Sequence, residues 1–273
     1  MNRNNRKQIA EETLAILEKG SYTLGANDVN IKERLTDSIE NTKLYIETEG
    51  FEKAKKQYET IIEVKNQTTN QALEEFVANK QSNVACLNFA SAKNPGGGFK
   101  GGSQAQEECI ARSSGLYACV SPVDEYYLYH RGLKSCFYSD RTIYSPKVPF
   151  FRDNEDRLLA DHYFADIITS AAVNMGVVKQ REKDRMDEVK LAMEKRIQHV
   201  LNIAAKNDVK NIVLGAWGCG VFMNDPVMIS QLFVEQLSKG GAFENVFERI
   251  TFAVLDRNNK GIFSAFFDAF QAN

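Results

Sequence analysis

The chain is poor in cysteine and has no pattern that would pair its cysteines. Five are spread over 273 residues, and no two form a Cys-x-x-Cys motif. They are Cys86, Cys109, Cys119, Cys136 and Cys219. An odd, scattered set disfavours both a disulfide framework and a zinc site. We therefore expect reduced, buried thiols.

An excess of charge of either sign is also missing. The formal net charge is −2, from 34 Lys and Arg against 36 Asp and Glu, with both signs mixed along the chain. A protein that coats nucleic acid would carry a basic excess, so direct binding of DNA or RNA is not expected. The charge balance is still compatible with a small anionic ligand, because backbone N–H groups can bind an anion without net positive charge.

Long apolar runs are absent as well. The polar and basic residues 1–7 are not followed by the apolar stretch of a signal peptide, and no segment is long enough to cross a membrane. We therefore expect a cytoplasmic protein without membrane contacts. Because 43% of the residues are hydrophobic, a chain of this length can bury a large core.

Apolar segments typical of strands alternate with helical patterns from about residue 58 onwards. The strands are expected at 59–65, 83–89, 142–148, 166–171, 211–214 and 249–255, and the helices at 68–78, 104–116, 185–205, from 225, and at 262–270. This alternation predicts an α/β fold with a mixed, mainly parallel sheet flanked by helices. Residues 1–57, charged and mostly helical in pattern, are expected to form an accessory extension on a core of residues 58–273.

Two glycine-rich loops follow predicted strands. The first reads N-F-A-S-A-K-N-P-G-G-G-F-K-G-G-S-Q-A-Q-E-E over residues 88–108, and the second reads G-A-W-G-C-G-V-F over residues 215–222. Five glycines in seven residues cost conformational entropy, which close contact with a ligand would justify. Lys100 is followed by Gly101, so the phosphate motif of P-loop hydrolases is missing. Because ligands bind beyond the carboxyl ends of such strands, both loops are predicted to line one crevice.

Two adjacent carboxylates follow the first loop. Ser103 and Gln106 fit a capping box, S-x-x-Q, which would give Gln106 a structural role and place Glu107 and Glu108 in the second turn of a helix. Adjacent helix positions point about 100° apart, so the two acids should have different roles. From spacing alone, two solvated acids near a helix N-terminus are the better explanation.

The first loop resembles the signature of the poly(ADP-ribose) glycohydrolases, in which a triple glycine is followed after a short spacer by Gln-Glu-Glu. Its flanking residues resemble the microbial branch of that family. The similarity extends to residues 59–78, to I-T-S-A-A-V-N at 168–174 and to G-A-W-G-C-G-V-F-M-N-D-P at 215–226. It therefore covers most of the chain. The resemblance implies a macrodomain-like fold with an N-terminal helical extension.

The resemblance also implies roles for individual residues. Glu108 matches the catalytic acid, Glu107 the neighbour that holds the ribose, and Asn94 the residue that binds the distal ribose hydroxyls. The implied site consists of Glu107 and Glu108 for catalysis, with Asn94, Gly96, Gly97, Gly98, Phe99, Gln106, Gly218, Cys219, Gly220, Val221 and Phe222 for the ligand. It includes no metal and no cofactor.

The implied reaction is hydrolysis of ribose–ribose O-glycosidic bonds in poly(ADP-ribose) on modified macromolecules, with release of ADP-ribose. Cleavage needs an acid for the leaving oxygen and a base for water, and one carboxyl group can serve as both in turn. A helix N-terminus favours the charged carboxylate, so the sequence leaves open how Glu108 keeps a proton. Two alternatives are a hydrolase of ADP-ribose on an amino acid or nucleobase, and a module that binds ADP-ribose without cleaving it.

Other conspicuous side chains have simpler explanations. Cys219 could be a nucleophile, but no histidine lies near it in sequence, and a small residue filling a tight turn is the better interpretation. Trp217 could belong to the core or to the wall of a diphosphate site, and the core is the better interpretation. His199 is expected at the surface. An aromatic ring near a strand end is expected to stack on adenine. The candidates are Phe252, Phe263, Phe266 and Phe267, although their spacing suits a core equally well.

Overall fold

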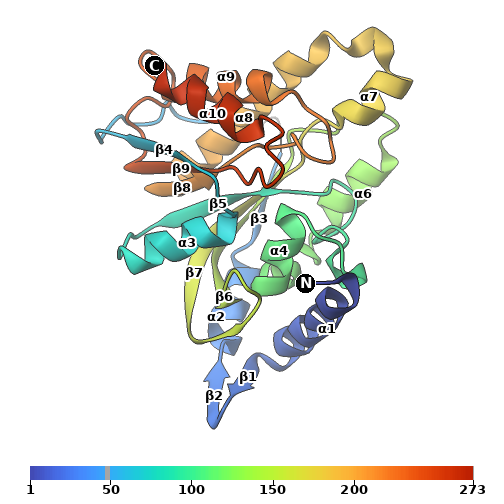
Figure 1. Cartoon of the computed structure of the whole chain (residues 1–273), viewed down its shortest axis with the longest axis vertical. Coiled ribbons are helices and arrows are strands. Elements are labelled where there is room, and N and C mark those ends of the chain that lie inside the picture. The colour runs from blue at the N-terminus through green and yellow to red at the C-terminus, as the bar shows by residue number, and fades with distance from the viewer. Residues whose placement is uncertain (47–49, 273) are drawn as a thin grey trace.

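The computed structural model of the protein describes residues 1–46 and 50–272. At its centre, the described strands form one seven-stranded sheet in the order β3-β6-β7-β5-β8-β9-β4 (Figure 1). These strands are β3 (Lys43–Tyr45), β6 (Thr142–Arg152), β7 (Leu158–Ser170), β5 (Val84–Phe89), β8 (Asn211–Leu214), β9 (Arg249–Ala253) and β4 (Ile61–Lys65). The five strands from β7 to β4 run parallel, whereas β6 is antiparallel to both neighbours. The predicted mixed, mainly parallel sheet is confirmed.

Strand β5 lies in the middle of this sheet and carries the first glycine loop at its carboxyl end. Its residues Val84 to Asn88 are all buried, as expected for a parallel strand covered on both faces. It pairs with β7 on one side, where Phe89 lies opposite Ser170, and with β8 on the other. The loops that follow β5, β7 and β8 therefore leave the same edge of the sheet.

Helices cover both faces of the sheet (Figure 1). One core cluster packs the sheet against α7 (Met175–Arg181), α8 (Glu188–Lys206), α9 (Pro226–Leu237) and α10 (Ile262–Gln271), with the short η2 (Lys183–Arg185) before α8. The opposite cluster packs it against α3 (Thr69–Ala78), α4 (Gln106–Ser113), α5 (Leu116–Val120) and α6 (Asp124–Gly132). The helix expected from residue 225 is confirmed as α9, and Asp225 caps it by accepting from the Val227 N–H at 3.0 Å. None of the described helices has the length and apolar character to cross a membrane.

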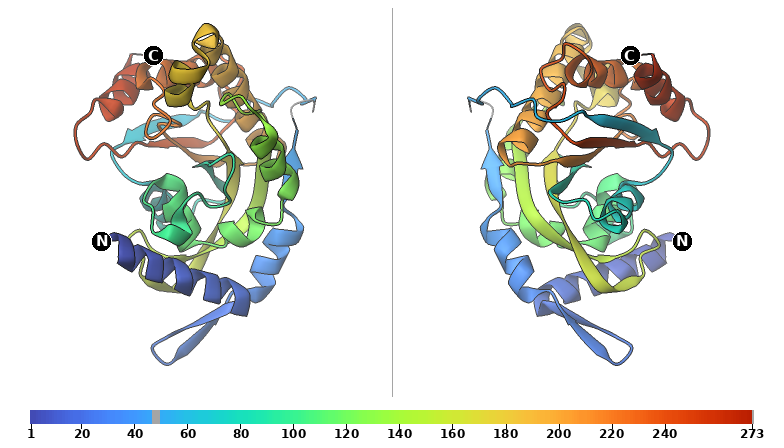
Figure 2. Two further views of the ribbon diagram at one scale, coloured as in Figure 1. Left: turned by 90° about the vertical axis from the view of Figure 1, so that its right-hand side faces the viewer. Right: turned by 90° about the vertical axis from the view of Figure 1, so that its left-hand side faces the viewer.

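The N-terminal segment wraps one end of the core (Figure 2). It consists of α1 (Arg3–Lys19), the hairpin of β1 (Ser21–Leu24) and β2 (Asn27–Asn30), α2 (Lys32–Glu40) and β3. Gly20 ends α1 in the left-handed conformation, with φ of 75°. Because β3 pairs with β6, this segment also contributes an edge strand to the main sheet. The division at residue 57 stays a prediction.

Two sequence expectations concern reactive side chains away from the loops. The five cysteines are unpaired thiols, and Cys86, Cys119 and Cys219 are buried, as predicted. Cys109 and Cys136 are only partly buried, so the prediction of burial is wrong for these two. The surface position predicted for His199 is wrong. Its side chain is only 7% exposed, and its ring lies 5.4 Å from that of Phe51, which belongs to the stretch between β3 and β4.

Candidate active site

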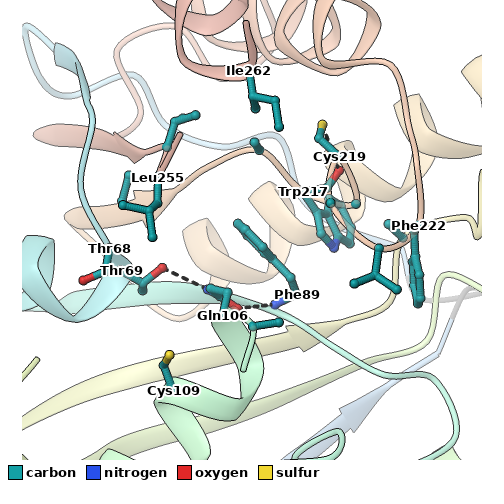
Figure 3. Close-up of a pocket in the computed structure, with 18 of the residues that line it drawn as sticks. Thr68, Thr69, Phe89, Gln106, Cys109, Trp217, Cys219, Phe222, Leu255 and Ile262 are labelled. Atoms are coloured by element: carbon teal, nitrogen blue, oxygen red, sulfur yellow. Dashed lines mark hydrogen bonds between the residues drawn. The ribbon is translucent and has the colours of Figure 1, made fainter. Parts of the chain in front are cut away.

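A cavity of about 470 Å³ opens at the edge of the sheet where β5, β7 and β8 end (Figure 3). Its size falls within the range of small-molecule sites. Its walls come from the start of α3, the end of β5, the start of α4, the second glycine loop and the segment after β9. Among the lining residues are Thr68, Thr69, Phe89, Ala90, Gln106, Cys109, Trp217, Gly218, Cys219, Gly220, Val221, Phe222, Leu255, Arg257 and Ile262.

One end of this cavity is mainly apolar. Phe89 and Leu255 face it from the sheet edge, and Ile262 faces it from the start of α10 (Figure 3). None of the four phenylalanines proposed from sequence for adenine stacking lines it; Phe252 and Phe266 are fully buried, with ring centroids 5.7 Å apart. Sequence reasoning missed Phe89. The only signal for it was its place as the last residue of the central strand.

Gln106 ties three elements together at the cavity wall. Its Oε1 accepts from the Phe89 N–H at 2.9 Å, and its Nε2 donates to Thr69 Oγ1 at 3.0 Å (Figure 3). The same Nε2 also donates to the Leu87 carbonyl at 2.7 Å. The capping box predicted with Ser103 is wrong, because α4 begins at Gln106 itself and the amide is used by β5 and α3 instead. The two acids consequently lie in the first turn rather than the second.

Glu107 points into the protein. Its side chain is 4% exposed; Oε2 accepts from the Ser91 N–H at 2.7 Å, and Oε1 accepts from Asn88 Nδ2 at 3.3 Å. Burial raises the pKa of Glu107 to about 8, with a further increase from the charge of Glu108, and these effects outweigh the hydrogen bonds that stabilise the carboxylate. Burial and the neighbouring carboxylate therefore both favour the neutral form of this carboxyl group.

Glu108 lies beside Glu107 but is half-exposed, and its Oε1 accepts from the Gly98 N–H at 2.9 Å. The glycine loop passes directly over both acids. Gly97 has φ of 60°, and a Cβ there would lie 2.5 Å from Oε1 of Glu108 and 2.9 Å from Oε2 of Glu107. Only glycine fits this position. The adjacent acids thus have different environments, as the 100° offset predicts.

The structure separates the site residues predicted from sequence into two neighbouring groups. Gln106 and the second-loop residues Gly218–Phe222 line the cavity. The acids and Gly96–Gly98 form a cluster that adjoins it, beyond Ala90 and Gln106, and Asn94 is exposed on the same loop. Phe99 is fully buried beneath the loop, with its ring centroid 5.3 Å from that of Tyr117.

The second loop contains no activated nucleophile. Burial raises the pKa of the Cys219 thiol to about 12, so it stays protonated. Trp217 is fully buried, as predicted, and its Nε1 donates to the Ser170 carbonyl at 3.2 Å. In residues 1–46 and 50–272, no three His, Cys, Asp or Glu side chains are grouped so that they could share a metal ion.

Tyr138 is a further neighbour of the site that the sequence did not reveal. It has φ of 57°, which is strained for a bulky residue, and its ring lies 6.1 Å from that of Phe222. The two rings connect the segment before β6 with the second glycine loop. No local pattern could have indicated this contact, because it joins residues far apart in the chain.

Comparisons with known proteins agree with this geometry. The family model of the microbial-type PARG catalytic domain, where PARG is poly(ADP-ribose) glycohydrolase, matches residues 10–153. None of the curated proteins compared with the chain matches it.

Solved structures extend the similarity over nearly the whole chain. The poly(ADP-ribose) glycohydrolase of Thermomonospora curvata is 39% identical with a TM-score of 0.93, and the match covers 98% of this chain and 100% of that one. The structure of the same enzyme bound to the inhibitor ADP-HPD gives 39% identity and a TM-score of 0.90, and the match covers 97% of this chain and 99% of that one. The poly(ADP-ribose) glycohydrolase of Deinococcus radiodurans in complex with ADP-ribose is 39% identical with a TM-score of 0.83. That match covers 87% of this chain and 97% of that one. The chain therefore belongs to the microbial-type poly(ADP-ribose) glycohydrolase family.

Proposed function

We propose that this protein hydrolyses the ribose–ribose O-glycosidic bonds of poly(ADP-ribose) and releases ADP-ribose, with Glu108 as general acid and then general base. The observation that carries this proposal is the position of Glu108. It is the half-exposed acid of the pair, it adjoins the cavity, and the Gly98 N–H fixes its Oε1 at 2.9 Å. A carboxyl group so placed can reach a bound sugar without losing its orientation.

The reaction builds positive charge on the ribose ring as the glycosidic bond breaks. In the proposed sequence, Glu108 as general acid delivers a proton to the departing ribose oxygen as the glycosidic bond breaks. The resulting carboxylate then takes a proton from the water that attacks the anomeric carbon. Because Glu107 is buried and holds the Ser91 N–H, it is assigned to positioning of the loop and the ribose rather than to activation of water.

The cavity supports ADP-ribose as the product unit. Its apolar end, formed by Phe89, Leu255 and Ile262, suits a flat base, and the second glycine loop suits a diphosphate because it exposes backbone. Glu107 and Glu108 follow the lining residue Gln106 along α4, and we propose that the distal ribose lies where they adjoin the cavity. The D. radiodurans relative has been solved with ADP-ribose bound. We further propose that the substrate is polymer on cytoplasmic macromolecules.

Release of ADP-ribose from poly(ADP-ribose) by wild-type protein and by Glu108→Gln tests the proposal. Loss of a general acid–base group should slow release by about 10²- to 10⁴-fold. Glu235→Gln, which changes an exposed acid on α9, is the control and should leave the rate unchanged. Equal release by wild type and Glu108→Gln would exclude Glu108 as the catalyst.

The linkage is tested by a panel of substrates under the same conditions. The panel compares poly(ADP-ribose) with peptides that carry a single ADP-ribose on serine or arginine and with an ADP-ribosylated nucleobase. We expect the highest kcat/KM with the polymer. A higher value for a single ADP-ribose would instead assign the site to that linkage, and binding of ADP-ribose without turnover of any substrate would make the protein a binding module.

A further inference from the structure

The start of α1 lies against the catalytic glycine loop, although the two are about 95 residues apart in sequence. Helix α1 packs on η1 (Phe99–Gly101), the short turn that follows the triple glycine. Arg3 Nε donates to the Gly101 carbonyl at 2.9 Å, and Arg6 Nε donates to the Gly102 carbonyl at 2.8 Å. Two guanidinium groups thus bond carbonyls at the end of η1, where a helix leaves its acceptors unpaired.

The approach is too close to be a loose surface contact. Gly102 has φ of 73°, and a Cβ there would lie 2.3 Å from the Arg3 carbonyl oxygen. Any other residue at this position would therefore push the helix and the loop apart. The sequence of the loop and the position of α1 depend on each other.

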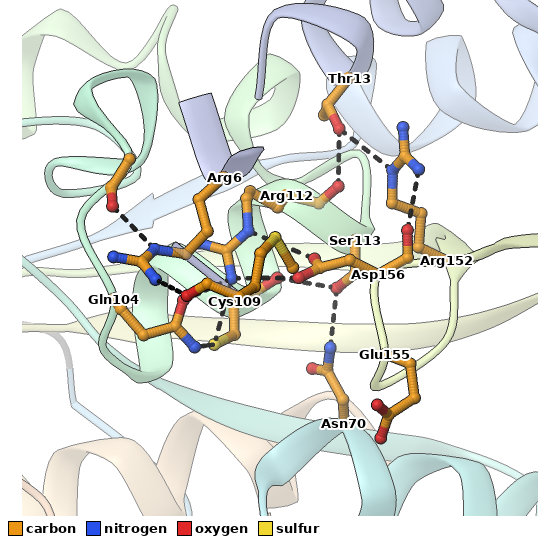
Figure 4. A network of polar contacts seen from close by, with 12 residues as sticks. Arg6, Thr13, Asn70, Gln104, Cys109, Arg112, Ser113, Arg152, Glu155 and Asp156 are labelled. Atoms are coloured by element: carbon orange, nitrogen blue, oxygen red, sulfur yellow. Dashed lines mark hydrogen bonds and ion pairs between the residues drawn. The ribbon is translucent and has the colours of Figure 1, made fainter. Parts of the chain in front are cut away.

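A second set of contacts fixes the same loop from beneath (Figure 4). Arg112 is 1% exposed; it donates to the Ser103 carbonyl at 3.2 Å and to Gln104 Oε1 at 2.7 Å. Thr13 of α1 donates from its hydroxyl to the carbonyl of Arg112 at 2.7 Å. Helix α1 therefore contacts the loop both directly, through its arginines, and indirectly, through α4.

These contacts lead to the catalytic carboxylate in few steps. The Gly98 carbonyl accepts from the Gly101 N–H at 3.0 Å and from the Ser103 N–H at 3.2 Å, so the far end of the turn sets the orientation of Gly98. The Gly98 N–H in turn donates to Oε1 of Glu108. A shift at Gly101 and Gly102 would move the donor that orients Glu108.

We propose that α1 is a positioning element for the reaction and that Arg3 and Arg6 are its positioning residues, which act on Glu108 through the glycine loop. This inference rests on the proposed function, in which Glu108 carries the chemistry. Arg3 is exposed and Arg6 only half-buried, so their hydrogen bonds contribute little to global stability compared with the buried contacts of α1. Their removal should change the loop rather than unfold the protein.

The test is the double variant Arg3→Ala/Arg6→Ala, assayed with poly(ADP-ribose). Because a displacement of about 1 Å can cost up to about 100-fold in rate, we expect kcat to fall at least about tenfold. KM should stay within about threefold, since the cavity walls are untouched. Arg3→Lys/Arg6→Lys should restore much of the rate, because an ammonium group can still donate to each carbonyl.

Lys7→Ala is the matched control. It removes a cation from the same turns of α1, and Lys7 pairs with Glu11, at 3.7 Å, on the exposed side of the helix. An equal loss of kcat in Lys7→Ala would mean that net charge, not loop geometry, is responsible, and would overturn the proposal. A rise in KM with unchanged kcat would overturn it as well, because the loop would then serve binding alone.

Amide hydrogen exchange separates this inference from the proposed function. In the double variant, peptides spanning residues 98–104 should exchange faster, whereas peptides from β5 and β8 should exchange as in wild type. Unchanged exchange in the loop would overturn the inference, whatever the activity. If wild-type protein does not cleave poly(ADP-ribose), the proposed function fails, yet faster loop exchange would still show that the arginines hold the loop. Should the double variant unfold, single Arg3→Ala is measured in the same way.

Discussion

The side-chain amide of Asn88 donates from Nδ2 to Oε1 of Glu107 at 3.3 Å, and both side chains are withdrawn from solvent. The same nitrogen lies 3.2 Å from Thr169 Oγ1, whereas Asn88 Oδ1 has no hydrogen-bond partner among the described residues. Reversal of this amide would turn Oδ1 toward Glu107, where it could accept the proton of a neutral carboxyl group. Asn88 can therefore serve either protonation state of Glu107.

Glu107→Gln should change the pH dependence of stability. Burial raises the pKa of Glu107 from its ordinary value of 4.5 to about 8 in the folded protein. The folded state binds this proton more tightly than the unfolded state does. The stabilisation of the fold by the protonated carboxyl group is therefore complete below pH 4.5 and is lost as the pH rises toward 8. The uncharged amide escapes this loss, so the variant should gain on the order of a few kcal/mol relative to wild type between pH 5 and pH 8.

Thermal unfolding of both proteins at pH 5 and pH 8 measures this effect. The quantity to compare is the difference in Tm between variant and wild type at each pH. Glu235→Gln is the control, because it changes an exposed acid and its difference should be the same at both pH values. An identical pair of differences for Glu107→Gln would show that burial does not hold the proton on Glu107.

Gly97→Ala should abolish most of the activity. Its Cβ would collide with both carboxylates, so either the loop or the Glu108 carboxylate must leave its present position. We expect kcat/KM to fall about 100-fold or more, together with a stability loss of about 1–2 kcal/mol from the left-handed backbone. Steady-state kinetics and chemical denaturation measure the two effects separately.

The chain offers a matched control for this substitution. Gly25, in the β1–β2 hairpin, has φ of 62°, and a Cβ there would meet nothing within 4 Å. Gly25→Ala should thus show a similar loss of stability with unchanged kcat/KM. If both variants lose activity equally, backbone strain rather than contact with the acids explains the effect at Gly97.

Cys219→Ala should retain activity. The thiol is buried, its pKa is raised to about 12, and its Sγ lies 3.8 Å from the Trp217 carbonyl oxygen. A protonated thiol is a poor nucleophile, so kcat should stay within roughly threefold of wild type. Assay with poly(ADP-ribose) measures it. A loss comparable to that of Glu108→Gln would assign covalent chemistry to Cys219.

Much of the fold followed from local patterns. The strand expected at 83–89 and the helix expected at 68–78 are found as β5 and α3. Thr68 caps α3 by accepting from the Gln71 N–H at 3.1 Å. The participation of β3 in the main sheet had no such signal. Its partner strand β6 lies about 100 residues away in sequence, and the local pattern of a three-residue strand does not indicate such a partner.

The candidate site was predictable in composition more than in geometry. The 100° offset between adjacent helix positions indicates different roles for Glu107 and Glu108, but which one points inward depends on where α4 begins. That start was misplaced, because the S-x-x-Q pattern fits a capping box while the real partners of Gln106 come from β5 and α3. The contact of Arg6 with the loop was likewise invisible to local patterns.

Gln106 provides the last prediction, which separates a positioning role from direct contact with the ligand. Gln106→Ala leaves the Phe89 N–H and the Leu87 carbonyl without their partner, so stability should fall by about 2 kcal/mol or more. Affinity for ADP-ribose should fall too, because Phe89 lines the cavity. Gln106→Glu keeps an acceptor for the Phe89 N–H but places a carboxylate oxygen against the Leu87 carbonyl oxygen. This variant should therefore be destabilised as well. Denaturation and ADP-ribose titration would contradict this role if affinity fell in both variants while stability was unchanged.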